Sequence, residues 1–149
     1  MVKKNLRIKQ DMLLDNQLCF ALYSTSLVMT KVYKPLLDKL GLTYPQYVVM
    51  LVLWECDALT VSEIGERLFL DSGTLTPLLK RLQGASLITR FRDALDERCL
   101  RVKLTATGRK LQSKAAMIPG CVLSATQCPA LKLKSLTQEI NALRMQLKS

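Results

Sequence analysis

The cysteines are the side chains from which chemistry is most readily expected. The chain has five of them and no histidine, and they stand at Cys19, Cys56, Cys99, Cys121 and Cys128. They are widely spaced, with no Cys-x-x-Cys pair, so we predict no metal site and no cofactor. In a reducing compartment such cysteines are free thiols, and a disulfide forms as a redox event. Thiol oxidation is therefore the expected chemistry, with Cys56 and Cys99 interpreted as packing residues.

Cys19 lies in a stretch where apolar residues have helical spacing. Judged from the residues alone, a cysteine in such a place is more often a small buried side chain than a reactive group. A reactive thiolate needs hydrogen-bond donors or positive charge directed at its sulfur. The candidate donors are the hydroxyls of Tyr23, Tyr33 and Tyr44, which fall on the same helix and at the start of the next.

Positive charge is concentrated in one quarter of the chain. The formal net charge is +10, from 22 basic and 12 acidic residues. Residues 78–114 alone contain ten Lys or Arg and three Asp or Glu, which suggests a polyanionic partner, with a solvated basic surface as the alternative. No uncharged apolar run approaches the roughly 18 residues of a membrane span, and the N-terminus lacks a signal-peptide pattern. We expect a cytoplasmic protein without membrane contact.

The first third of the chain is predicted to be helical. Apolar residues recur every three or four positions over residues 12–33, which indicates a long amphipathic helix. Pro35 should kink or end this helix, and Gly41 should close a short helical piece that follows. The capping-box spacing of residues 43–46 then predicts a helix over about residues 44–57.

Two further helix starts follow closely. Thr60 and Glu63 have capping-box spacing, and Asp71 or Ser72 can cap a second helix that runs to about Gly84. The residues of this second helix expected in the core are Leu75, Leu78, Leu79 and Leu82. Two short helices joined by a tight connection are typical of a helix-turn-helix, in which the second helix presents side chains to DNA.

The apolar period then changes from helical to alternating. Residues 100–104 alternate apolar and basic side chains, which predicts a strand with one buried face. Residues 89–92 can pair with it across the polar connection 93–98. The product is a β-hairpin with a basic tip, the wing of a winged helix, and Thr105 can cap the helix that comes next.

The C-terminal region is predicted to form the partner-facing part of the molecule. Pro119-Gly120 interrupts the helical pattern, and a last helix follows Cys128-Pro129. Its apolar residues recur at intervals of three and four, as in a helix–helix seam, and they are Leu133, Leu136, Ile140, Leu143 and Leu147. Packing on the same chain is the alternative, but the long apolar helices flanking a small winged helix favour a second subunit.

The predicted fold class is mainly α with a small β-hairpin wing, an α+β winged helix-turn-helix. We expect residues 1–149 to form one domain, with the winged helix at about 45–105. The dimer is then formed by the N- and C-terminal helices, at about 10–40 and 105–149.

The second helix and the wing carry the candidate contacts to duplex DNA. Short polar side chains at a helix start let the backbone approach a groove, and cations can reach phosphates or bases. This set comprises Ser72, Thr74, Thr76, Lys80, Arg81, Arg90 and Arg92. At the wing tip, Asp96 can orient Arg98 for entry into the narrow minor groove. The alternative role of the hydroxyl residues is simple helix capping. The alternative for Asp96 and Arg98 is an exposed ion pair that adds little stability.

Residues 59–111 resemble the winged helix of the MarR family of bacterial regulators. The family's wing signature is Asp-x-Arg, then an alternating strand and Leu-Thr-x-x-Gly, and it matches Asp96, Arg98, Leu104, Thr105 and Gly108. This resemblance implies a homodimeric repressor with one winged helix in each subunit and a pseudo-palindromic DNA operator.

The resemblance covers nearly the whole chain, because residues 13–24 and 42–55 are similar to the organic-hydroperoxide-sensing branch, OhrR. It implies that Cys19 is the sensing cysteine and that Tyr33 and Tyr44 contact its sulfur. The implied chemistry is attack of the Cys19 thiolate on an organic hydroperoxide, which yields a sulfenic acid that condenses with another thiol.

The identity of the second thiol decides the subtype of sensor. Among such proteins it is a cysteine of the other subunit or a small cellular thiol. Cys128 and Cys121 both lie in the relevant region, although Ser124 occupies the usual place. Cys128 is preferred, because a bond beside the last helix would displace the dimer seam and change the separation of the two recognition helices.

The sequence therefore predicts a bacterial, cytoplasmic repressor, not an enzyme, that releases DNA when Cys19 is oxidised. One alternative is a related regulator that binds a phenolic or other small ligand in the dimer crevice, with the cysteines incidental. A thiol peroxidase is the other alternative, and the basic wing argues against it.

Overall fold

A computed structural model of the chain describes residues 9–148, and the expectations for residues 1–8 and 149 lie outside that range. Within it the chain forms two short 3-10 helices, seven α-helices and three strands. In chain order they are η1 (Gln10–Met12), η2 (Leu14–Asn16), α1 (Leu18–Asp38), α2 (Tyr44–Glu55), β1 (Leu59–Thr60), α3 (Val61–Leu68), α4 (Ser72–Gly84), β2 (Ile88–Arg92), β3 (Leu100–Leu104), α5 (Ala106–Ala115), α6 (Ile118–Thr126) and α7 (Ala130–Lys148).

The course of α1 differs from the prediction at both ends. The helix begins only at Leu18, after the two 3-10 helices, and it continues through Pro35 to Asp38. Proline removes one helical hydrogen bond, but burial of Leu37 in the core holds the last turn in place. The separate piece expected before Gly41 is the closing turn of α1, where the Leu42 N–H donates to the Leu37 carbonyl at 3.1 Å.

The predicted helix-turn-helix is present, and local side-chain caps define it. Thr60 and Glu63 form the expected capping box of α3, and the Asp71 carboxylate caps α4 by accepting the Thr74 N–H at 2.7 Å. All four expected leucines of α4 are buried. A Cβ on Gly65 would lie 2.8 Å from the Leu70 carbonyl oxygen, so only glycine lets the turn pack this closely on α3.

The wing is part of a three-stranded antiparallel sheet in the order β1-β3-β2. The predicted hairpin of β2 and β3 is confirmed, with Arg90 opposite Val102. Strand β1 was not predicted, because two residues are too few to show an alternating pattern. It places Leu59 opposite Val102 on the other edge of β3, and so it attaches the wing to the start of α3.

The core lies between α2, α3, α4 and the sheet, and α5 packs against it. None of the described side chains in the core is polar or charged. The Trp54 indole N–H donates to the Gly108 carbonyl at 2.9 Å, which joins α2 to α5. Cys56, interpreted from the sequence as a packing residue, is instead exposed, because α2 ends at Glu55 and leaves Cys56 at the helix cap.

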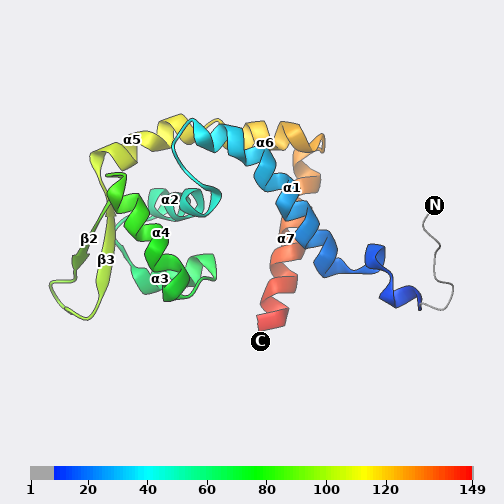
Figure 1. Cartoon of the computed structure of the whole chain (residues 1–149), viewed down its shortest axis with the longest axis horizontal. Coiled ribbons are helices and arrows are strands. Elements are labelled where there is room, and N and C mark those ends of the chain that lie inside the picture. Colours follow the sequence, from blue (N-terminus) through cyan, green and yellow to red (C-terminus); the bar gives the residue numbers. More distant parts are fainter. Residues whose placement is uncertain (1–8, 149) are drawn as a thin grey trace.

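The flanking helices are poorly covered by the rest of the chain. Figure 1 shows α1, α5 and α6 along one side of the molecule, with the winged helix below one end and α7 descending from α6. No residue of α7 is buried, and its Leu136 is an exposed apolar side chain. On α1, Leu18 and Val28 are exposed in the same way. Among residues 9–148, no helix has the length and apolar character needed to cross a membrane.

Asp57 is a polar hub at the base of the sheet that the sequence analysis did not single out. Its carboxylate accepts the N–H groups of Ala58 and Leu104 at 2.8 and 2.9 Å and pairs with Arg109 at 3.2 Å. Burial alone would raise the pKa of Asp57, but these hydrogen bonds and the Arg109 charge lower it. The lowered pKa means that the ionised carboxylate of Asp57 stabilises the folded state.

We expect Asp57→Ala to reduce the free energy of unfolding at pH 7 by about 1–3 kcal/mol, because two backbone N–H groups lose their acceptor. The stabilisation is present above about pH 3.9, the unfolded-state pKa, and is lost as the pH falls through the lower folded-state pKa. Urea titrations at pH 7 and pH 3 measure both effects. Glu55→Ala, which removes an exposed ion pair with Arg67, is the control and should cost less than about 1 kcal/mol; equal losses would contradict the hub.

Candidate functional site

The start of α4 presents short polar side chains to solvent. Ser72 and Thr74 are exposed in its first turn, and Thr76 is half-buried. The N–H groups of Thr74 and Gly73 lower the pKa of Asp71 by hydrogen bonding to its carboxylate, so the cap remains ionised. Because the opposite face of α4 carries the buried leucines, the hydroxyl face is held outward at a fixed angle.

The cations predicted to contact DNA reach solvent, although one of them, Arg90, already has a side-chain partner. Lys80, Arg81 and Arg92 are exposed. The Arg90 Nε–H donates to the Gln83 side-chain oxygen at 2.7 Å, which joins the wing strand β2 to the end of α4. Arg90 therefore fixes the wing relative to the helix as well as contributing charge.

The wing tip holds Arg98 in a defined orientation. Its Nε–H and one terminal N–H donate to the two Asp96 carboxylate oxygens, at 3.1 and 3.4 Å, while 91% of the Arg98 side chain stays exposed. These hydrogen bonds lower the pKa of Asp96. An exposed pair of this kind adds little stability. Its effect is on geometry, because it limits the conformations open to the Arg98 side chain.

Arg101 supports the wing from its base, a role that the sequence analysis did not foresee. It pairs with Asp93 at the beginning of the wing turn and donates to the Ala58 carbonyl at 2.9 Å. The alternating pattern placed Arg101 on the exposed basic face. A signal for its structural role was the presence of Asp93 at the opposite end of the same turn.

The structure separates the five thiols. Cys19 is exposed in the first turn of α1, Cys121 is exposed on α6, and Cys128 is half-buried just before α7. Cys99 is half-buried in the wing, where burial and the neighbouring Asp96 raise the pKa of its thiol. In Figure 1 the beginning of α1 and the α6–α7 junction lie well apart. All five cysteines are free thiols.

Two of the three predicted tyrosines lie together, and a third ring was missed. Tyr33 and Tyr44 have ring centroids 5.0 Å apart, and Tyr47, only 3% exposed, stands 5.9 Å from Tyr33. Tyr23 is exposed on α1 and stands apart from them. Burial raises the pKa of Tyr33 and Tyr47, so these hydroxyls keep their protons and remain donors. The apolar spacing of α2 marks Tyr47 only as a core residue.

Cys19 does not reach this tyrosine cluster within one chain. It precedes Tyr33 by 14 residues on the same helix, which corresponds to roughly 21 Å along the axis. A contact between Cys19 and these tyrosines therefore requires a second chain. A cavity of about 310 Å³ lies instead beside Tyr33 and Tyr44, bounded by Met29 of α1 and by Leu136 and Ile140 of α7.

Comparison with known proteins gives consistent matches over the chain. The family model "Transcriptional regulator SarA/Rot" matches residues 31–115, more than half of the chain. The organic hydroperoxide resistance transcriptional regulator of Bacillus subtilis is 52% identical over 132 residues, which cover 89% of this chain and 90% of that protein.

Solved structures of AbfR, a protein of Staphylococcus epidermidis, match in fold and sequence. Reduced AbfR bound to DNA is 35% identical, with a TM-score of 0.77 over 91% of this chain and 95% of that one. Disulfide-formed AbfR is 38% identical, with a TM-score of 0.63 over 87% and 91%. The match to a DNA-bound protein agrees with the placement of the polar face of α4 beside the basic wing, and this chain belongs to the MarR- and SarA-type winged-helix transcriptional regulators, within the branch of the organic hydroperoxide resistance regulators.

Proposed function

We propose that this chain is a dimeric repressor that holds duplex DNA while Cys19 is reduced and releases it when an organic hydroperoxide oxidises Cys19. The observation that carries the proposal is the joint presentation of two features. The polar face of α4 and an Arg98 oriented by Asp96 lie side by side, since Thr76, Arg90 and Arg98 line one cavity of about 200 Å³. A protein that reads DNA acts where the chromosome is, in the bacterial cytoplasm.

In this proposal α4 enters the major groove. Ser72 and Thr74 lead, since side chains in the first turn of a recognition helix reach base edges. The wing lies beside it, so Arg98 enters the neighbouring minor groove, where negative potential is enhanced. Lys80, Arg81 and Arg92 contribute phosphate contacts, which supply affinity without sequence information.

The dimer follows from the uncovered helices. Residues at about 45–105 form the winged helix, and the helices at about 10–40 and 105–149 carry the exposed apolar side chains. A second copy of the chain covers these faces and sets two recognition helices at a fixed separation. Half-sites one turn of DNA apart, about 10 base pairs, then require a pseudo-palindromic operator.

The sensing site then lies between subunits. Since the length of α1 keeps Cys19 away from Tyr33 and Tyr44 of its own chain, we assign the contact to the partner's Tyr33 and the partner's Tyr44. Their hydroxyls donate to the thiolate without competing as nucleophiles. The apolar cavity beside them suits the organic part of a hydroperoxide better than it suits hydrogen peroxide.

The redox step involves one oxygen transfer and one condensation. The Cys19 thiolate attacks the outer peroxide oxygen, the O–O bond breaks, and the departing alkoxide takes a proton to leave as an alcohol. A second thiol then attacks the sulfenic sulfur, and water leaves as the disulfide forms. One oxidation consumes one Cys19, so the protein senses the peroxide and does not turn it over.

A cysteine of the other subunit is our candidate for the second thiol. Exposure favours Cys121 over Cys128, because a resolving thiol must reach the partner's Cys19 and Cys128 is half-buried. This reverses the order of preference drawn from the sequence. The disulfide-formed AbfR structure matches this one with a lower TM-score than the reduced DNA-bound form does, 0.63 against 0.77. This difference supports a change of conformation when such a bond forms.

A small ligand in the same crevice is the second candidate function. The cavity between α1, α2 and α7, at about 310 Å³, lies at the lower end of the size range of small-molecule sites. A phenol that releases DNA from a Cys19→Ser variant under reducing conditions would favour this function over thiol sensing.

We expect Arg98→Ala to raise the Kd of the reduced protein for its operator by roughly five- to 150-fold, because a minor-groove contact is lost. Asp96→Asn should weaken binding to a lesser degree, although it removes a negative charge, because Arg98 loses its orientation. Glu97→Gln removes the same charge at the wing tip and is the matched control. Fluorescence anisotropy with a duplex from upstream of the coding region measures all three. Stronger binding by Asp96→Asn would contradict the orienting role.

Cys19→Ser should bind this duplex as tightly as the wild type and keep binding after treatment with cumene hydroperoxide. The hydroxyl of serine forms no thiolate, so the oxygen-transfer step cannot occur. The same anisotropy assay, before and after oxidation, tests this. Normal release by the variant would move the sensor to another residue.

A non-reducing gel after cumene hydroperoxide treatment should show a covalent dimer that Cys121→Ser abolishes and Cys128→Ser retains. The reason is that Cys121 is the more exposed of the two candidate thiols. The opposite pattern would restore Cys128 as the resolving residue. A covalent dimer that persists in both variants would exclude both cysteines.

A further inference from the structure

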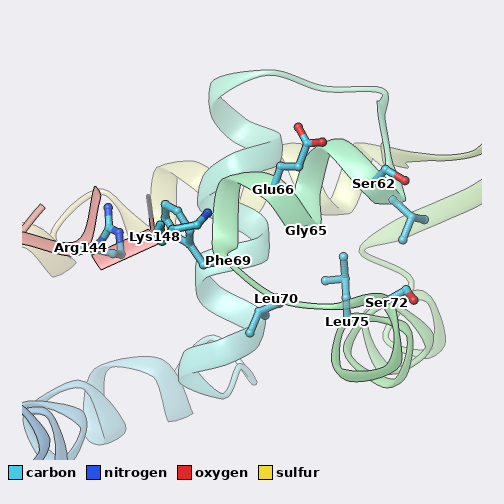
Figure 2. A pocket seen from close by; sticks show the side chains of 10 residues that line it. Ser62, Gly65, Glu66, Phe69, Leu70, Ser72, Leu75, Arg144 and Lys148 are labelled. Atoms are coloured by element: carbon cyan, nitrogen blue, oxygen red, sulfur yellow. The ribbon is translucent and has the colours of Figure 1, made fainter. Parts of the chain in front are cut away.

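The C-terminal end of α7 touches the turn of the helix-turn-helix through two cations on one aromatic ring. The guanidinium carbon of Arg144 lies 4.2 Å from the centroid of the Phe69 ring, and the Lys148 ammonium lies 4.5 Å from it. Both distances are within the roughly 6 Å over which a cation is attracted to an aromatic face. Figure 2 shows Arg144 and Lys148 approaching Phe69 from α7.

Phe69 is an unusual residue for the position that it holds. It ends α3 with a φ of 57°, in the left-handed region that bulky side chains rarely adopt. Its ring does not fill the core, since 45% of the residue is exposed. A strained backbone with an outward aromatic ring is poorly explained by stability alone, whereas a docking point for the cations of α7 explains both features.

The contact with Phe69 is the main interaction of the Arg144 guanidinium. Its Nε atom is buried and has no hydrogen-bond partner among residues 9–148, so the Phe69 ring supplies an attraction that no acceptor there supplies. Behind the contact lies a cavity of about 730 Å³, lined by Ser62, Glu66 and Ser72 of the helix-turn-helix as well as by the two cations. The end of α7 thus meets the turn through a narrow contact and not through a packed interface.

The other end of α7 lies beside the candidate redox thiols. Helix α7 begins at Ala130, directly after Cys128-Pro129, and Cys121 is on the preceding helix. Its 19 residues span about 28 Å. One helix therefore links the region where a disulfide would form to the turn from which the recognition helix α4 starts.

We propose that Phe69, Arg144 and Lys148 are positioning residues that transmit a displacement of α7 to α4. The inference rests on the proposed function, because the displacement comes from the disulfide between subunits. In the reduced protein the cations hold the turn where α4 fits the groove. In the oxidised protein the same contact carries the movement of α7 into the turn and tilts α4 away from DNA.

Phe69→Leu tests this without changing any charge, and Arg144→Gln combined with Lys148→Gln removes the same contact from its other side. The matched control is Lys132→Gln with Lys134→Gln, which makes the same charge change at the far end of α7. For each protein, anisotropy with the duplex from upstream of the coding region gives the Kd before and after oxidation by cumene hydroperoxide. Dimedone trapping of Cys19 and thermal unfolding are measured on the same samples.

We expect the ratio of oxidised to reduced Kd to fall about tenfold in both contact variants, within the usual range of coupling between sites, and to stay at the wild-type value in the control. In both contact variants the oxidation of Cys19, followed by dimedone trapping, should be as fast as in the wild type. A general loss of structure would instead change this rate together with the Kd ratio. Wild-type ratios in both contact variants would overturn the transmission role and leave the proposed function intact. A wild type whose Kd does not change on oxidation of Cys19 would overturn both.

Discussion

A straight helix cannot bring its own two ends together, and this constraint governs the sensing part of the molecule. Cys19 lies in the first turn of α1 and Tyr33 about four turns further on, so in the proposed site the thiol meets its hydroxyl donors only where a second chain supplies one of them. The proposed sensor is complete only as a dimer. Any covalent change at Cys19 then acts directly on the relation between subunits, the quantity on which recognition of two half-sites depends.

The helix-turn-helix and the wing meet a different requirement, which is to hold exposed polar side chains in defined orientations. The apolar face of α4 is fully buried and the described core contains no polar side chain, so the helix has one favourable seating. Around it, short polar links fix the wing: Arg90 to Gln83, Arg101 to Asp93 and Asp57 to the Leu104 backbone. Each is weak alone, but together they set the angle between helix and wing.

Local signals in the sequence predicted most of the helix-turn-helix and the wing, and little of the proposed sensing site. Capping boxes at Thr60, the leucine spacing of α4 and the alternation in β3 report on residues a few positions apart, and all were confirmed. Strand β1, the passage of α1 through Pro35 and the exposure of Cys56 depend on tertiary packing, which short-range patterns do not record. The family resemblance named Cys19, Tyr33 and Tyr44, but it did not reveal that one chain keeps them apart.

The wing thiol shows how a molecule with several cysteines can give a single answer to an oxidant. Cys99 donates its S–H to the Asp96 carboxylate at 3.6 Å, and this neighbour together with burial keeps the proton on sulfur. Because peroxides react with the thiolate and hardly with the thiol, the thiol of the wing reacts slowly with an oxidant. In the proposed mechanism, the concentration of oxidant that releases DNA is then set by Cys19 at the start of α1, and oxidation of the wing does not alter it.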